Sequence, residues 1–176
     1  MSELFPEQAP DFTDPLGLLR ACHERVLASC TLLEAVNQQL QSDALDDDGV
    51  KAATQVQRYF STAAKLHHQD EEQDLFPLLV RTSLKIAQII HDLKQDHQKI
   101  DGFWAELEPQ LKRPRSIEDK QAFAEVVEQF VSLNRAHVAR ENEELLAVAE
   151  HLISDKEQKR LGAAMAKRRG VTIYLK

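Results

Sequence analysis

The feature that most constrains this chain is a His-x-x-x-Glu motif that occurs twice, from His67 to Glu71 and from His137 to Glu141. Residues four apart lie on one face of an α-helix, so the two side chains of each copy can reach a single point. One such pair is a weak signal of a metal site. Two copies in one chain are a much more specific signal.

A lone histidine precedes each copy of the motif. His23 lies 44 residues before His67, and His97 lies 40 residues before His137. The chain therefore has an internal repeat in which each half contributes two histidines and one glutamate. The predicted metal ligands are His23, His67, Glu71, His97, His137 and Glu141.

This donor set predicts a centre of two metal ions. Imidazole together with carboxylate suits iron, and also zinc or manganese, and no thiolate belongs to the set. Each glutamate is placed to bridge the two ions. Without metal the arrangement is costly, because a buried carboxylate that lacks a partner destabilises the fold or stays protonated. We therefore prefer a metal site to a structural layer of histidines.

The composition and the spacing of apolar residues predict an all-α fold. Five glycines and six prolines in 176 residues leave little room for the turns of a β fold. Apolar residues recur in steps of three and four, as in amphipathic helices. We expect helices over residues 15–40, 50–81, 83–108 and from 116 past 148, and a shorter one from 154 to about 168. The short connections favour an up-down-up-down four-helix bundle with a short additional C-terminal helix.

Caps and prolines indicate where these helices begin and end. Asp14 before Pro15 is a helix start. A capping box is expected to open the fourth helix at Ser116. Proline removes a backbone donor, so we expect Pro77 to kink or break the end of the second helix and the third helix to end before Pro109.

The helix lengths place the six ligands at one depth in the bundle. His23 lies about 17 residues before the end of the first helix, and His67 lies about 17 residues after the start of the second. His67 is about 14 residues from the end of its helix, and His97 is about 14 residues into the next. Antiparallel helices with these offsets bring the ligands to the same level.

The remaining histidines are expected to lie away from the metals. His68 is turned by about 100° from the ligand stripe, so we place it beside the site or on the surface. His91 lies off the stripe of the third helix and is expected to face solvent. His151 is expected at a helix carboxyl end, where a cation is favoured.

The charge runs around the motifs are expected to be solvated. In residues 70–72 and 140–144, only Glu71 and Glu141 lie on the apolar stripes. The three basic residues at 167–169 are expected to be ordinary surface charges. The net charge of -7 argues against nucleic acid as a partner, since phosphate binding needs clustered Lys and Arg.

The chain is expected to be one domain, a bundle over residues 14–170 after an irregular segment 1–13 and before a tail 171–176. Cys22 and Cys30 lie on one predicted helix about 12 Å apart along its axis, too far for a disulfide. Reduced thiols, with no signal peptide and no membrane-spanning apolar run, predict a soluble cytoplasmic protein. No helix face is a convincing dimer stripe, so a monomer and a homodimer stay open.

These residues resemble the hemerythrin-like (HHE cation-binding) family, in its intracellular bacterial type with four histidines and two glutamates as ligands. The resemblance spans about residues 15–170 and includes Phe76-Pro77 after the first motif. It implies a four-helix bundle around two iron ions bridged by oxide or hydroxide. The family's oxygen carriers have a second histidine four residues before the third-helix ligand, where this chain has Leu93. They also have His-x-x-x-x-Asp on the fourth helix. These departures argue against simple reversible oxygen carriage.

The resemblance leaves three functions open. The preferred one is a protein that binds or senses a small ligand such as oxygen or nitric oxide, or buffers iron. Six protein ligands and a bridge leave an exchangeable position for such a molecule. The second is a di-iron enzyme that acts on nitric oxide or reactive oxygen species or supports iron-centre repair, although no separate acid–base pair or Gly-rich loop favours catalysis. The third is an interaction module that the metal merely stabilises.

Overall fold

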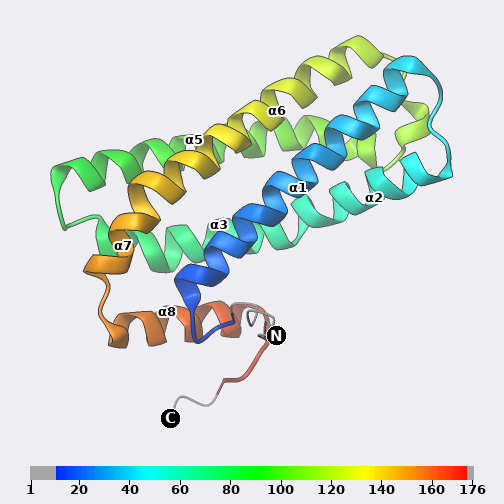
Figure 1. The fold of residues 1–176 in the computed structure, drawn as a ribbon. Helices are drawn as coiled ribbons and strands as arrows, with labels where there is room; N and C mark the ends of the chain where they lie inside the picture. Colours follow the sequence, from blue (N-terminus) through cyan, green and yellow to red (C-terminus); the bar gives the residue numbers. More distant parts are fainter. Residues whose placement is uncertain (1–10, 174–176) are drawn as a thin grey trace, which may run out of the picture.

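The protein is a bundle of four antiparallel helical rods with a fifth helix packed on its side (Figure 1). Our computed structural model describes residues 11–173, and most of the predicted segment 1–13 and half of the tail lie outside that range. The first rod is α1 (Pro15–Ser42) and the third is α5 (Leu84–Leu111). The second rod consists of α2 (Asp47–Ser61), α3 (Ala63–Asp70), the π-helix η1 (Glu71–Leu75) and α4 (Phe76–Leu79).

The fourth rod repeats the plan of the second. It consists of α6 (Lys120–Arg140), the π-helix η3 (Glu141–Leu146) and α7 (Ala147–Leu152). A 3-10 turn, η2 (Pro114–Ser116), precedes it, and α8 (Asp155–Arg168) follows. The predicted all-α, up-down-up-down bundle with a short additional helix is confirmed.

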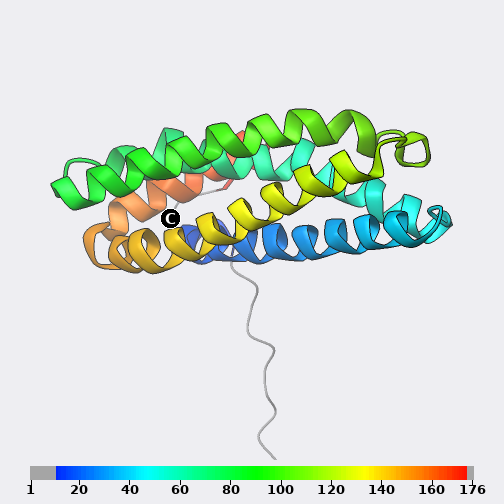
Figure 2. The same cartoon turned by 90° about the horizontal axis from the view of Figure 1, so that it is seen from above.

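The rods form a closed ring. α1 packs against α2 and α6, and α5 packs against the same two helices from the other side. Figure 2 shows the four rods running along one common direction. α8 lies alongside the first part of α1 and contacts α1, α3 and η1. It therefore covers the side of the bundle where these segments meet.

Several predicted caps are present. The Asp14 carboxylate accepts a hydrogen bond from the Gly17 amide at 3.0 Å at the start of α1. Ser154 and Glu157 form the reciprocal capping box that opens α8. Gly170, with φ of 70°, ends the chain's last helical turn in the left-handed conformation that glycine adopts readily.

Three predicted boundaries are wrong. The cap of α6 is Asp119, whose carboxylate accepts from the Ala122 amide at 2.9 Å, while Ser116 belongs to the 3-10 turn. α2 begins at Asp47 rather than at Val50, because Asp46 caps it. α5 continues through Pro109 to Leu111, because a proline in the last turn removes only one hydrogen bond.

The two π-helices also correct the prediction of regular long helices. Each begins at the glutamate of a His-x-x-x-Glu motif. A π turn takes one more residue than an α turn, so it rotates the helix that follows. A regular α-helix would continue the apolar stripes from Leu75 to Leu78 and from Leu145 to Val148. These two residues are only half-buried, and the buried residues are instead Leu79 and Ala149. π turns inside α-helices are frequent at functional sites.

The hydrophobic core is divided into two clusters. The first fills the bundle toward the α1–α2 connection and includes Val26, Ala64, Ile100 and Val138. The second lies toward α8 and includes Leu19, Leu75, Leu93 and Leu145. Along each rod, the predicted ligands lie where the chain passes from one cluster to the other. The predicted common depth is therefore confirmed.

Cys22 and Cys30 are buried and unpaired, as their spacing on one helix requires. Across residues 11–173, no helix combines the length and the apolar character needed to cross a bilayer.

Candidate metal centre

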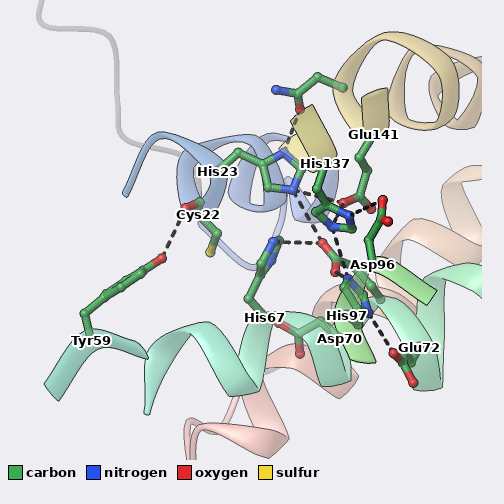
Figure 3. Close-up of polar contacts among 12 residues, drawn as sticks. Cys22, His23, Tyr59, His67, Asp70, Glu72, Asp96, His97, His137 and Glu141 are labelled. Atoms are coloured by element: carbon green, nitrogen blue, oxygen red, sulfur yellow. Dashed lines mark hydrogen bonds and ion pairs between the residues drawn. The ribbon is translucent and has the colours of Figure 1, made fainter. Parts of the chain in front are cut away.

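A buried polar layer separates the two apolar clusters (Figure 3). It contains all six predicted ligands, and none of them is more than 3% exposed: His23, His67, Glu71, His97, His137 and Glu141. They come from all four rods, so only the folded bundle brings them together. Their ligand atoms fall into two groups, and the atoms within each group lie within 4.8 Å of one another.

Glu71 belongs to both groups, and its two oxygens face different histidines. Oε1 lies 2.8 Å from His67 Nε2 and 3.5 Å from His23 Nε2. Oε2 lies 3.3 Å from His97 Nε2. A carboxylate whose two oxygens face two separate sets of nitrogens has the geometry of a bridging ligand.

Glu141 joins the two groups a second time. Its Oε2 lies 3.3 Å from His23 Nε2 and 3.4 Å from His137 Nε2. The Nε2 atoms of His97 and His137 approach to 3.1 Å. Nitrogens and oxygens from four rods thus converge on one small volume.

His97 and His137 lie within hydrogen-bonding geometry of each other, but the carboxylates of Glu71 and Glu141 have no such partner within residues 11–173. His23 Nε2 and both carboxylate oxygens of Glu71 and Glu141 are buried without a hydrogen-bond partner among the described residues, despite the short separations. An unsatisfied buried carboxylate is strongly destabilising. Donors that point at a common space rather than at one another fit a metal ion that would occupy that space.

Hydrogen bonds on the outer side fix the rings. His23 Nδ1 lies 2.7 Å from Asn142 Oδ1, and His97 Nδ1 lies 2.7 Å from Glu72 Oε1. An imidazole that donates from Nδ1 keeps its Nε2 lone pair for the interior of the site. His137 Nδ1 faces Asp96 Oδ2 at a longer 3.6 Å. Such outer partners orient a metal ligand and increase its basicity.

His68 lies inside the site rather than on the surface. Its ring stacks on the ring of His97, with centroids 3.9 Å apart and an angle of 17° between the planes. One of its nitrogens groups with ligand atoms of Glu71, His97 and His137. Burial and the neighbouring His97 hold the pKa of His68 well below its ordinary value, so its ring is neutral.

Asp70 corrects the expectation of a solvated charge run, because it is fully buried. Two arginines at the C-terminal end of α8 neutralise it. Arg169 binds it bidentately at 2.7 and 3.1 Å, and Arg168 binds both Asp70 and, at 2.7 Å, Asp74. Arg168 and Arg169 were expected to be ordinary surface charges. They instead form ion pairs that connect the C-terminal end of α8 to Asp70, the residue before Glu71.

The charges of the layer are coupled. Burial alone would lower the pKa of His23, but Glu141 and Glu71 outweigh it and raise that pKa to about 9. Burial is likewise outweighed at His67, where Glu71 raises the pKa well above its ordinary value. Burial opposes ionisation of Glu71, yet His67 and His23 hold its pKa well below the ordinary range. Without metal, these pKa shifts favour the imidazolium forms of His23 and His67 and the carboxylate form of Glu71.

These charges predict a characteristic pH dependence for the metal-free protein. A raised pKa at His23 stabilises the fold fully below the ordinary value of 6.5, and that contribution is lost as pH rises through about 9. We expect the free energy of unfolding of chelator-treated protein to fall from about pH 6 to about pH 9, as measured by urea denaturation. Metal-loaded protein should lack this decline, because binding releases the protons. A flat or rising profile for the metal-free protein would contradict the assigned charges.

His91 and His151 lie where the sequence predicts. His91 is exposed on α5, and His151 is exposed in the last turn of α7. Trp104 is buried in the first apolar cluster, as expected for a core residue. The sequence placed His68 beside the site or on the surface, and it did not indicate that Asn142 or Glu72 contacts the ligands. Only the adjacency of each to a predicted ligand was visible in the sequence.

Comparison with known proteins agrees with this geometry. The hemerythrin HHE cation-binding domain model matches residues 14–149, which end before α8. A protein of Haemophilus influenzae, described as uncharacterized, is 29% identical over 171 residues, which cover 97% of this chain and 99% of that protein. The match to the family therefore spans the four rods and every residue of the polar layer.

Proposed function

We propose that this chain, which belongs to the hemerythrin HHE cation-binding family, holds two iron ions and uses them to bind or sense a small ligand such as oxygen or nitric oxide, or to buffer iron. The observation that carries the proposal is the shared carboxylate of Glu71, whose oxygens face the His23/His67 pair and the His97 side separately. A single ion would not explain two sets of donors on opposite sides of one carboxylate.

In this proposal the residues of the layer divide into three roles. His23 and His67 bind one ion, His97 and His137 bind the other, and Glu71 and Glu141 bridge them. Iron supplies reversible redox chemistry and affinity for diatomic molecules. Imidazole with carboxylate also accepts zinc or manganese, so these ions are expected to substitute for iron in solution.

A hollow beside the layer supports access by a small molecule. Its volume is about 450 Å³, and the rings of His68 and His97 form part of its wall. The other lining residues are mostly polar and include Lys65, Glu72 and Glu108. This hollow connects the surroundings of one half of the layer with the exterior, which favours a binding or sensing role over a purely structural one.

The first test is metal content and an optical spectrum of the aerobically purified protein. We expect about two irons per chain and a near-ultraviolet absorption band of a bridged ferric pair. Anaerobic reduction followed by nitric oxide should change the spectrum reversibly. A folded protein that takes up no iron on anaerobic reconstitution would contradict the proposal, and sustained metal-dependent turnover of nitric oxide or peroxide would replace it by an enzymatic function.

Removing the metal is expected to destabilise the bundle. A metal ion that binds only the folded protein raises the free energy of unfolding, and the increase grows with the logarithm of the free metal concentration divided by Kd. Chelator-treated protein should therefore unfold at a lower temperature than loaded protein, and added Fe²⁺ under anaerobic conditions should restore the difference. Equal melting temperatures would show that the layer does not bind the ion tightly in the folded protein.

A further inference from the structure

We infer that His68 is a fifth histidine ligand and binds the same ion as His97 and His137. The inference rests on the proposed two-metal centre and concerns which residues complete it. It also makes the two halves of the centre different, because one ion then has three histidine ligands and the other has two.

The first observation is how α3 presents two successive side chains. The His67 ring faces the ring of His23, with centroids 4.8 Å apart and the planes nearly perpendicular. The His68 ring turns to the other half of the layer, where it stacks on His97 and lies 6.1 Å from His137. Adjacent residues of a helix point about 100° apart, so neighbouring histidines can serve two neighbouring ions.

The second observation is the grouping of ligand atoms. One nitrogen of His68 and the ligand atoms of Glu71, His97 and His137 all lie within 4.8 Å of one another. The other group contains His23, His67, Glu71 and Glu141. Each group has four donors and shares Glu71. His68 has in the second group the place that Glu141 has in the first, so with Glu141 also bridging it would give the second ion a fifth protein donor.

The third observation is what α5 does not provide. Leu93, one turn before His97, is fully buried in the apolar cluster that faces α8. α5 thus contributes a single histidine to the layer. Without His68, the second group would hold two histidines and Glu71 as mutually close donors, with Glu141 approaching His137 at 3.4 Å. The donor that α5 lacks comes from α3 instead.

His68 also lies in the wall of the hollow, so its side chain affects how small molecules reach the second ion. The hollow is lined by His68 and His97 but not by His23, His67 or either bridging glutamate. The His68 ring therefore lies between the hollow and the second ion. Shortening this side chain should open that ion to small molecules entering from the hollow.

The test compares His68→Ala with the matched control His91→Ala, in which an exposed histidine of α5 is removed. The metal-free proteins are titrated anaerobically with Co²⁺ against a competing chelator, and the visible absorption of Co²⁺ is followed. We expect two equivalents for the unsubstituted protein and for His91→Ala. In His68→Ala, the second equivalent should bind more than about 100-fold more weakly or be lost, a larger effect than the roughly 10–100-fold expected for loss of an outer partner of a ligand.

Imidazole added to His68→Ala distinguishes direct ligation from a packing effect. A free imidazole small enough for the hollow should restore the second equivalent and its absorption, while it should not change His91→Ala. Loss of the second equivalent without recovery by imidazole, in a variant that melts like the unsubstituted protein, would show that His68 acts only by stacking on His97 and would overturn the ligand assignment. Two unchanged equivalents in His68→Ala would overturn it as well. Absence of Co²⁺ binding to the unsubstituted protein would instead contradict the two-metal centre itself.

Discussion

Replacing Glu71 with glutamine is expected to lower the metal content from about two ions per chain to well below one. The two oxygens of Glu71 face different groups of histidines, Oε1 toward His67 and Oε2 toward His97, so a neutral amide there weakens both ions at once. Glutamine has nearly the same size as glutamate, so the variant should still fold. Elemental analysis after anaerobic reconstitution, with circular dichroism to verify the helices, measures the effect.

Two other glutamates serve as controls for Glu71→Gln: Glu72, the next residue, and Glu143, two residues after the other bridging glutamate. Glu143 is exposed on η3, and Glu143→Gln should keep both ions. Glu72 touches the layer only through His97 Nδ1, so Glu72→Gln should keep both ions while binding one of them about 10–100-fold more weakly. Equal loss of metal in Glu71→Gln and Glu72→Gln would show that the bridging carboxylate was wrongly assigned.

Replacing both arginines at the C-terminal end of α8 is expected to lower the free energy of unfolding more than any other substitution proposed for this protein. In Arg168→Ala/Arg169→Ala, the carboxylate of Asp70 stays buried but loses both of its cationic partners. Breaking a buried ion pair from one side costs about 3–5 kcal/mol, because an uncompensated charge remains. Urea denaturation of the metal-free variant should show a decrease of this order in the free energy of unfolding.

The controls for this variant separate charge from packing. Lys167→Ala removes an exposed cation next to the pair and should change stability by less than about 0.5 kcal/mol. Adding Asp70→Asn to the double variant removes the stranded charge and should recover part of the loss. A double variant as stable as the unsubstituted protein would show that the ion pairs of α8 contribute nothing. Because Asp70 precedes Glu71, metal affinity should also be measured in these variants.

The sequence alone was sufficient for the bundle and for the six central residues of the layer. Apolar residues in steps of three and four specify helices and their buried faces, and local caps such as Asp14 and Ser154 act within one turn. The His-x-x-x-Glu spacing is likewise a property of a single helix. Counting residues from helix ends was enough to predict that His23, His67 and His97 lie at one depth, since the rise per residue is constant.

The tertiary structure decided what depends on contacts between rods. Asp70 is buried because α8 brings two arginines to it from almost a hundred residues away, and no local pattern encodes that pairing. Asn142 becomes the partner of His23 only because η3 and α1 meet.

His68 shows the same limit most clearly. Helix periodicity places it off the ligand stripe, but a stripe describes one face toward the bundle axis. The polar layer also contacts a second face of α3, the one that carries His68. There the ring of His68 stacks on the ring of His97 from α5. The π turns at Glu71 and Glu141 were equally hidden, because no residue spacing in the sequence marks them; in the structure each contains at least one buried leucine that packs in the second apolar cluster. The sequence by itself determined the helices and the central donors, whose spacing is local. Only the packed bundle determined the outer partners, because those contacts form between segments that are distant in the chain.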